Sequence, residues 1–351
     1  MTCPQSQIGN RKSPIPALRV GIVGLGWWAC DVHVPNLLRT PGAQIAALCS
    51  RSEKGRQRGL EALGEHPEPL LFERLDDLLA SDAVDAVVLC TPNATHGALA
   101  LQAVRAGKHV LVEKPLATDP AECPPIVAAA AERGVVVQVG VELRHAPVAR
   151  AMRQQIEAGA IGQPVVLRTE LWRQWNAPHG WRADPAHASD TLYELAVHYL
   201  DLLGVLATAR PAWVTAGGGA RVTGHQPDHA MLTVGYDDGA VGALGLCLFA
   251  RGSTDAIPLE AVGTEGRLLG DVLGGTLRLW TKDGEARDLS PARSDAEVCG
   301  FPGSLECVGE FVAAIREGRA AHADAREGET LCRLCDGARR SLASEGRRIE
   351  L

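Results

Sequence analysis

Short apolar runs alternate with segments of helical periodicity over the first 145 residues. Apolar, β-rich runs occur at 18–23, 43–49, 70–72, 83–90, 109–112 and 135–139. Helical segments lie between them at 27–39, 53–63, 95–106 and 120–133. Strands that alternate with helices of about 10 to 15 residues indicate parallel βαβ units. We therefore predict an α/β domain with a doubly wound parallel sheet at 18–145, after a loose arm at 1–17.

The pattern changes after residue 145. Helical segments at 146–158 and 190–206 flank a strand at 164–172, and helices at 304–317 and 326–345 close the chain. Between them lie strand-like runs joined by glycine turns such as Asp238-Gly239, at 212–222, 228–236, 240–249, 256–263, 266–271 and 276–281. We predict an α+β domain at 146–351 with a large, mostly antiparallel open sheet, its C-terminal helix free to pack back on the first domain.

Composition excludes several classes of protein. The net charge of -7 leaves no basic surplus for a nucleic acid backbone, so no nucleic acid partner is expected. No run approaches the roughly 18 apolar residues of a spanning helix, and the first 17 residues lack the apolar core of a leader, so we expect a cytoplasmic protein without a membrane partner. The 10 cysteines are dispersed through apolar runs, which favours free thiols and no metal site.

A glycine-rich turn follows the first strand directly. Gly24 and Gly26, with Ala29 three residues on, form GxGxxA at the start of a helix. Such a turn lets the backbone approach a pyrophosphate, while the helix N-terminus supplies N–H donors. The sequence therefore predicts a Rossmann dinucleotide site whose loop consists of Gly24, Leu25, Gly26, Trp27 and Trp28.

The end of the second strand bears on the choice of cofactor. A carboxylate at this point holds the adenosine ribose of NAD, but here the strand ends in Ser50 and Arg51. A small hydroxyl and a guanidinium suit a 2′-phosphate, so the sequence favours NADP. NAD stays open, because Arg51 could stack on adenine and Glu53 could reach the ribose.

Two further motifs carry a family resemblance. Thr91-Pro92-Asn93-Ala94-Thr95-His96 follows the fourth main strand, and Glu113-Lys114-Pro115 follows the next. With the glycine loop they resemble the Gfo/Idh/MocA family, over essentially residues 18–351. The resemblance implies a two-domain NAD(P)-dependent oxidoreductase that acts on a CH–OH group of a sugar, polyol or inositol. It also implies a homodimer or homotetramer formed through the second sheet, and a cis peptide at Pro115.

The same resemblance assigns the candidate site. It places Lys114 and His198 at the reacting alcohol, with Glu194 where the family has aspartate. A lysine can polarise a carbonyl, and a histidine titrates near neutrality, so either suits proton transfer; Tyr193 is the alternative donor. Further cofactor contacts are expected from Thr91, Pro92, Asn93, His96, Glu113 and Lys114. Further substrate contacts are expected from Arg144, Trp172, Trp181, Arg182, Tyr193, Glu194 and His198.

Two other functions fit the same residues. Glutamate in place of aspartate is compatible with a reductase of a C=N bond or a nucleotide-sugar ketone. A dinucleotide-binding sensor without chemistry would also keep the fold, although the presence of both Lys114 and His198 argues against it.

Overall fold

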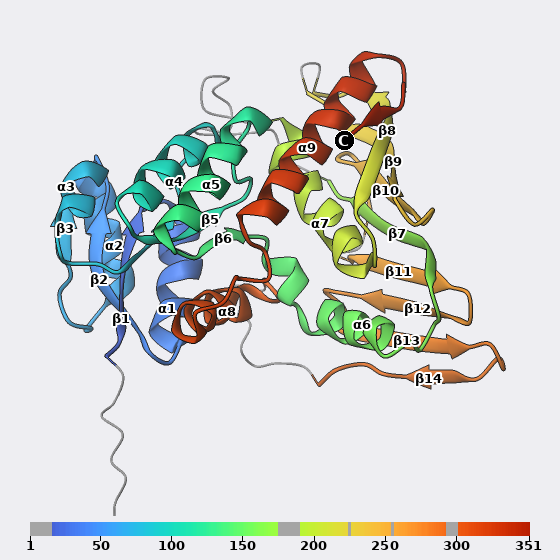
Figure 1. Cartoon of the computed structure of the whole chain (residues 1–351), viewed down its shortest axis with the longest axis horizontal. Coiled ribbons are helices and arrows are strands. Elements are labelled where there is room, and N and C mark those ends of the chain that lie inside the picture. The colour runs from blue at the N-terminus through green and yellow to red at the C-terminus, as the bar shows by residue number, and fades with distance from the viewer. Residues whose placement is uncertain (1–15, 175–189, 224–225, 254–255, 293–300) are drawn as a thin grey trace, which may run out of the picture.

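The computed structural model describes residues 16–174, 190–223, 226–253, 256–292 and 301–351. Most of the arm predicted at 1–17 lies outside this range, as do Trp175, Trp181 and Arg182. Within it, two sheets stand side by side, and the last helix of the chain lies against both domains (Figure 1).

The first sheet is parallel throughout and has six strands in the order β3-β2-β1-β4-β5-β6. Its strands are β1 (Leu18–Val23), β2 (Ala43–Cys49), β3 (Leu70–Phe72), β4 (Ala86–Leu89), β5 (His109–Glu113) and β6 (Val137–Gly140). This order is that of a Rossmann fold, in which ligands bind outside the carboxyl ends of the strands where the order reverses. The doubly wound sheet predicted from the sequence is therefore confirmed.

Helices cover both faces of this sheet. The glycine loop leads into a π-helical turn, η1 (Ala29–His33), and α1 (Val34–Arg39); the others are α2 (Glu53–Leu63), α3 (Leu75–Ala80), α4 (His96–Arg105) and α5 (Cys123–Arg133). Short 3-10 turns stand at η2 (Asn93–Thr95), η3 (Pro120–Glu122) and η4 (Glu142–His145). Helix α3 was not expected from the sequence, because its single apolar face is only six residues long.

The second sheet has nine strands in the order β14-β13-β12-β11-β7-β10-β9-β8-β15. They are β7 (Pro164–Trp172), β8 (Pro211–Gly219), β9 (His229–Tyr236), β10 (Val241–Cys247), β11 (Pro258–Gly263), β12 (Gly266–Asp271), β13 (Thr276–Thr281), β14 (Ala286–Asp288) and β15 (Ile349–Glu350). Only β10 and β7 pair in parallel, so the mostly antiparallel sheet is confirmed. The short edge strands β14 and β15 were not predicted.

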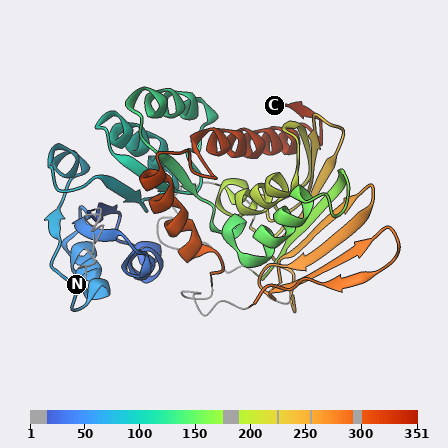
Figure 2. The ribbon, with the colours of Figure 1, turned by 60° about the horizontal axis from the view of Figure 1, so that its bottom comes forward.

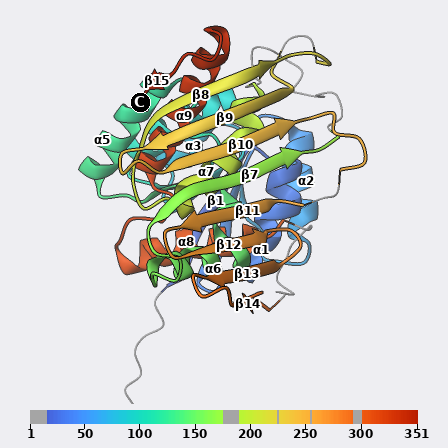
Figure 3. The same ribbon diagram turned by 90° about the vertical axis from the view of Figure 1, so that its right-hand side faces the viewer.

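One face of this sheet is covered and the other is open. Helices α6 (Pro147–Glu157), α7 (Val197–Leu206) and α9 (Ala325–Ala343) pack on the first face. Figure 3 looks onto the opposite face, across which no helix passes. None of the helices in the described part of the chain has the length and apolar character needed to cross a membrane.

The C-terminal segment returns to the Rossmann domain. Helix α8 (Ser304–Glu317) inserts Val308, Phe311 and Val312 into the core formed by β1 and α1. Helix α9 then packs on α5 and β6 of the first domain as well as on β8 of the second (Figure 2). The two domains are therefore joined by packing at several places, and the edge between them lies at the carboxyl ends of β4, β5 and β6.

Candidate active site

The glycine loop has the geometry of a dinucleotide cradle. Gly24 has φ of +85°, and a Cβ there would lie 2.6 Å from the carbonyl oxygen of Cys90, so only glycine fits. Gly26 has no atom within 4 Å of where a Cβ would be, which leaves its backbone open to a ligand. Leu25 is buried, whereas Trp27 is 49% exposed beside the loop. These residues fit the pyrophosphate of a dinucleotide.

The adenosine end of this cradle is polar and cationic. Ser52 caps α2 by accepting a hydrogen bond from Gly55 N, while Ser50 and Arg51 stand between β2 and this cap. Arg51 is exposed. Arg56 donates to the Ser50 carbonyl oxygen at 2.8 Å and pairs with Glu73, so its guanidinium is already engaged.

The loop after β4 is tied to the loop after β5 by a buried histidine. The two ring nitrogens of His96 each lie 2.8 Å from a carbonyl oxygen, one of Thr91 and one of Pro115. The Lys114–Pro115 bond is cis, as the family resemblance implies. His96 thus fixes the two motifs relative to each other; its ring is fully buried and faces no open space.

Glu113 anchors the start of the glycine-loop helix. Trp28 Nε1 donates to Glu113 Oε1 at 2.7 Å, and His33 Nε2 lies 2.7 Å from the same oxygen. Burial disfavours the Glu113 carboxylate, but the hydrogen bond and charge of His33 outweigh it and hold the pKa of Glu113 below its ordinary value. His33 was not expected from the sequence, where it looks like any residue of the helix.

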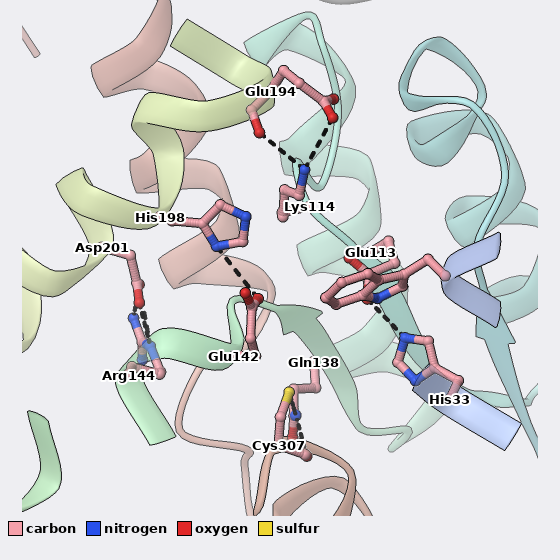
Figure 4. A network of polar contacts seen from close by, with 11 residues as sticks. His33, Glu113, Lys114, Gln138, Glu142, Arg144, Glu194, His198, Asp201 and Cys307 are labelled. Carbon is pink, nitrogen blue, oxygen red and sulfur yellow. Dashed lines mark hydrogen bonds and ion pairs between the residues drawn. The ribbon is translucent and has the colours of Figure 1, made fainter. Parts of the chain in front are cut away.

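Lys114 of the first domain lies against Glu194 of the second (Figure 4), and Asn93 contacts the same glutamate. The Lys114 ammonium donates to the Glu194 backbone oxygen at 2.9 Å and lies 3.5 Å from Oε1. Asn93 Nδ2 donates to Glu194 Oε2 at 2.6 Å. Both side chains of the Lys114–Glu194 pair are mostly buried, so the charges interact in a weakly screened environment.

A π-helical turn directly precedes α7. Glu194 lies in η6 (Leu192–Ala196), whose start is capped by Asp190 Oδ1, which accepts from Leu192 N. His198 lies at the second position of α7. Such π-helical turns are frequent at functional sites. The expected simple helix at 190–206 is therefore two kinds of helix joined at residue 197.

His198 faces Glu142, a residue that no motif in the sequence marks. His198 Nδ1 lies 3.4 Å from Glu142 Oε2, within ion-pair distance, but the contact lacks hydrogen-bond geometry. Burial, and then the Lys114 ammonium, lower the pKa of His198 to about 3. Burial, and then the charge of Glu113, raise the pKa of Glu142 to about 8. The only signal in the sequence was one carboxylate inside the otherwise apolar Val139–Leu143 stretch.

The structure does not bring every predicted substrate residue to the cluster of Lys114, Glu194 and His198. Arg144 forms a buried bidentate ion pair with Asp201 and donates to the His322 carbonyl oxygen. It lines a separate cavity of about 1200 Å³ between α6, α7 and α9, which contains none of Lys114, Glu194 and His198. The guanidinium of Arg144 is therefore engaged in contacts that stabilise the fold.

Tyr193 and Trp172 also point elsewhere. The Tyr193 hydroxyl is buried and donates to the Cys332 carbonyl oxygen on α9 at 3.3 Å. Trp172 is 51% exposed and follows the buried Leu171, so it lies on the open face of the sheet. Trp181 and Arg182 fall outside the described residues.

A Rossmann domain with an open glycine loop, beside a lysine, a glutamate and a histidine, defines an oxidoreductase that uses a nicotinamide dinucleotide. Two family profiles match this architecture. The one described as "oxidoreductase family, NAD-binding Rossmann fold" matches residues 18–141, and "GFO/IDH/MocA C-terminal domain" matches residues 149–269. The chain belongs to the Gfo/Idh/MocA family of oxidoreductases.

Individual relatives agree with this assignment. The 1,5-anhydro-D-fructose reductase of Ensifer adhaerens is 30% identical over 86% of this chain and 92% of its own. The scyllo-inositol 2-dehydrogenase (NAD(+)) of Bacillus subtilis is 30% identical over 74% of this chain and 75% of its own. Among solved structures, an oxidoreductase domain protein from Kribbella flavida has a TM-score of 0.85 at 26% identity, covering 96% of this chain and 99% of its own.

Proposed function

We propose that this chain interconverts a secondary alcohol and a ketone on a sugar, polyol or inositol, with NADP as its preferred cofactor. The observation that carries the proposal is the meeting of Lys114, Glu194 and His198 at the carboxyl end of β5. Relatives named for a cyclic sugar ketone and for an inositol support this substrate class.

The described residues fit a nicotinamide dinucleotide. Gly24, Gly26 and the N-terminal turn at Trp27 and Trp28 would hold its diphosphate, and Asn93 in the loop after β4 contacts Glu194. When bound, the cofactor supplies the hydride acceptor or donor. The exposed Arg51, beside Ser50 rather than a carboxylate, supports a 2′-phosphate at the adenosine end.

The chain's own groups handle the substrate oxygen. Lys114 can exchange its hydrogen bond with the Glu194 carbonyl oxygen for one with the substrate oxygen, where its charge stabilises an alkoxide. The Glu194 carboxylate can accept hydrogen bonds from neighbouring hydroxyls. His198 lies beside Lys114. It exchanges the proton that leaves the substrate oxygen in alcohol oxidation and joins it in ketone reduction.

Lys114→Ala tests the proposal. It should lower turnover on the true substrate by about 10²- to 10⁴-fold while the dissociation constant of NADP changes little, because the lysine acts on the reacting oxygen. The substrate is found by screening sugars, inositols and nucleotide-sugar ketones. Lys282→Ala, at an exposed ion pair on the second domain, is the matched control and should be unaffected. Unchanged turnover in Lys114→Ala, or cofactor binding with no turnover on any substrate, would count against the proposal.

We further propose that the open face of the second sheet joins two copies of the chain. Val166, Trp172 and Met231 are exposed on this face, and Met231 and Trp172 both border Gly245. An apolar patch of this kind on a sheet is typical of subunit contacts. The mass of the protein in solution by light scattering, with Met231→Lys as a variant expected to shift it toward the monomer, tests this proposal.

A cytoplasmic location is proposed on the state of the thiols. All eight cysteines in the described residues are free, and six of them are buried, which suits a reducing compartment. Fractionation of the cells that make the protein tests the location.

A further inference from the structure

Glu142 is a buried carboxylate for which the proposed reaction has so far given no role. It begins η4, directly after β6, and is 7% exposed. Its atom Oε2 has no hydrogen-bond partner among the residues that the structure describes. An unpartnered buried carboxyl oxygen is costly, so its presence calls for a physical reason.

The nearest polar group is the ring of His198. Nδ1 of this ring also lacks a hydrogen-bond partner within the described chain, and it lies 3.4 Å from Glu142 Oε2. Figure 4 shows the other ring nitrogen on the side of Lys114, where the substrate oxygen is proposed to bind. The ring therefore separates Glu142 from the reacting position, and a small rotation of either side chain would complete a hydrogen bond.

The surroundings set the charge on this pair. The titratable and charged groups near Glu142 come from neighbouring elements and from its own. They are Glu113 at the end of β5, Lys114 directly after it, His198, Tyr199 and Asp201 on α7, Cys307 on α8 and Arg144 in η4 itself. Asp201 and Arg144 neutralise each other in their ion pair. Burial dominates what remains and raises the pKa of Glu142 to about 8, so near neutral pH Glu142 carries a proton and His198 does not.

We propose that Glu142 is a positioning residue for His198 that also holds the proton which His198 exchanges with the substrate; this inference rests on the proposed function. The protonated carboxyl donates to Nδ1, which fixes the tautomer with hydrogen on Nε2, the atom nearer the substrate site.

The proton balance closes in both directions. In ketone reduction, Nε2 gives its proton to the substrate oxygen as the hydride arrives at carbon, and Nδ1 takes the proton of Glu142, which ends as a carboxylate. In alcohol oxidation, Nε2 takes the hydroxyl proton as the hydride leaves, and Nδ1 passes a proton to the Glu142 carboxylate. His198 is neutral before and after each turnover, which agrees with its lowered pKa.

Glu142→Gln tests this role, because glutamine has the same shape and no exchangeable acid. We expect turnover to fall about 10- to 100-fold in both directions. In the parent protein, the rate of ketone reduction should fall and the rate of alcohol oxidation should rise as pH increases through about 8. Both changes of rate with pH should be absent in the variant. Glu142→Asp, which keeps the acid, should restore the pH dependence in part.

Glu310→Gln is the matched control. Both glutamate side chains are 9% exposed, but Glu310 lies on α8 and pairs with Arg319, so its replacement should leave the rate and the pH profile unchanged. Thermal denaturation of each variant verifies that it folds. Glu142→Gln turnover within twofold of the parent, with the pH limb retained, would overturn the proposal.

A second readout does not depend on turnover. Nitrogen-15 NMR of the His198 ring reports which nitrogen carries hydrogen. In the parent protein we expect Nε2–H below pH 8 and a shift toward Nδ1–H above it, and no such change in Glu142→Gln. If this transition appears while no substrate is turned over, the proposed function fails and the Glu142–His198 pairing stands; if it is absent in the parent, the pairing is wrong.

Discussion

Glu194 connects the two domains through its own side chain. Its carboxylate receives Asn93 from the Rossmann domain at 2.6 Å, and its backbone oxygen receives Lys114 at 2.9 Å. Aspartate, one methylene shorter, would not reach Asn93 from the same backbone position. A glutamate rather than an aspartate at this position therefore lets η6 hold the loop after β4 directly.

Arg51 is expected to select the cofactor. Arg51→Ala should weaken NADP binding about tenfold or more and leave NAD within twofold, because only NADP carries the 2′-phosphate that a guanidinium can bind. Titration of cofactor binding by tryptophan fluorescence measures both constants. Arg58→Ala removes a neighbouring exposed arginine that pairs with Asp31 and should change neither. Equal losses for the two cofactors in Arg51→Ala would show that Arg51 binds no 2′-phosphate.

His198 should make the fold sensitive to acid. Its pKa is 6.5 when exposed and about 3 in the folded chain, so between these values the unfolded chain takes up a proton that the folded chain refuses. The stability due to the neutral ring is complete above pH 6.5 and is lost as pH falls.

His198→Gln should therefore gain about 1 to 2 kcal/mol relative to the parent on going from pH 7 to pH 5, whatever its stability at pH 7. Urea denaturation at the two pH values measures the change. His66→Gln, at an exposed position, should show no such gain. A constant difference between His198→Gln and the parent at both pH values would contradict this expectation.

The sequence shows the site residues only in part. Lys114, Glu194 and His198 stand in motifs whose spacing is visible, so they could be predicted. Glu142 could not, because a single glutamate in an apolar segment has no periodic signal and its partner lies 56 positions away.

Trp172 illustrates a second limit. Alternation along β7 shows that Leu171 and Trp172 face opposite sides, but which side is covered depends on α7 and α9.

At the scale of elements, the two glycines of the glycine loop are expected to have different roles, Gly24 in folding and Gly26 in dinucleotide binding. Gly24 has a positive φ and abuts Cys90, whereas no atom beyond the chain neighbours lies within 4 Å of a Cβ placed on Gly26. Gly26→Ala should thus fold with stability within about 1 kcal/mol of the parent and yet bind dinucleotide at least tenfold more weakly, because the added methyl occupies the approach of the diphosphate.

Calorimetry of cofactor binding, together with thermal denaturation, checks this expectation. Gly24→Ala is the contrasting variant and should lose stability itself, since alanine is strained at that backbone conformation and meets the Cys90 carbonyl at 2.6 Å. Parent-like affinity in Gly26→Ala would mean that the diphosphate does not lie against this residue.

Regular elements were predicted where apolar runs or helical periodicity mark them in the sequence. The buried strands β1, β4 and β5 and helix α9 follow from apolar runs and from periodicity. The π-helical turns η1 and η6 could not be predicted, since they add one residue to a turn without changing which residues are apolar. They nevertheless decide where His33 and Glu194 point.

At the scale of the molecule, the first domain is not complete at residue 145. Helix α8 fills part of its core with Phe311, whose side chain is fully buried. A fragment of residues 16–145 should therefore unfold without a cooperative transition, because it exposes the apolar surface on β1 and α1 that α8 covers.

A second fragment provides the control. Residues 16–145 joined by a flexible linker to residues 301–320 should regain a cooperative transition, and Phe311→Ala in that fragment should cost about 3 to 5 kcal/mol. Circular dichroism during urea denaturation distinguishes the outcomes. A cooperative transition in the shorter fragment would show that α8 is dispensable for this core.

The return of α8 to the first domain also orders events during synthesis. The ribosome releases the glycine loop and all six strands of the first sheet long before it releases Phe311. Until about 300 residues have been made, the apolar surface on β1 and α1 stays uncovered in the growing chain. The nucleotide-binding domain is thus translated first and completed nearly last, and in that interval its uncovered apolar surface makes it prone to aggregation.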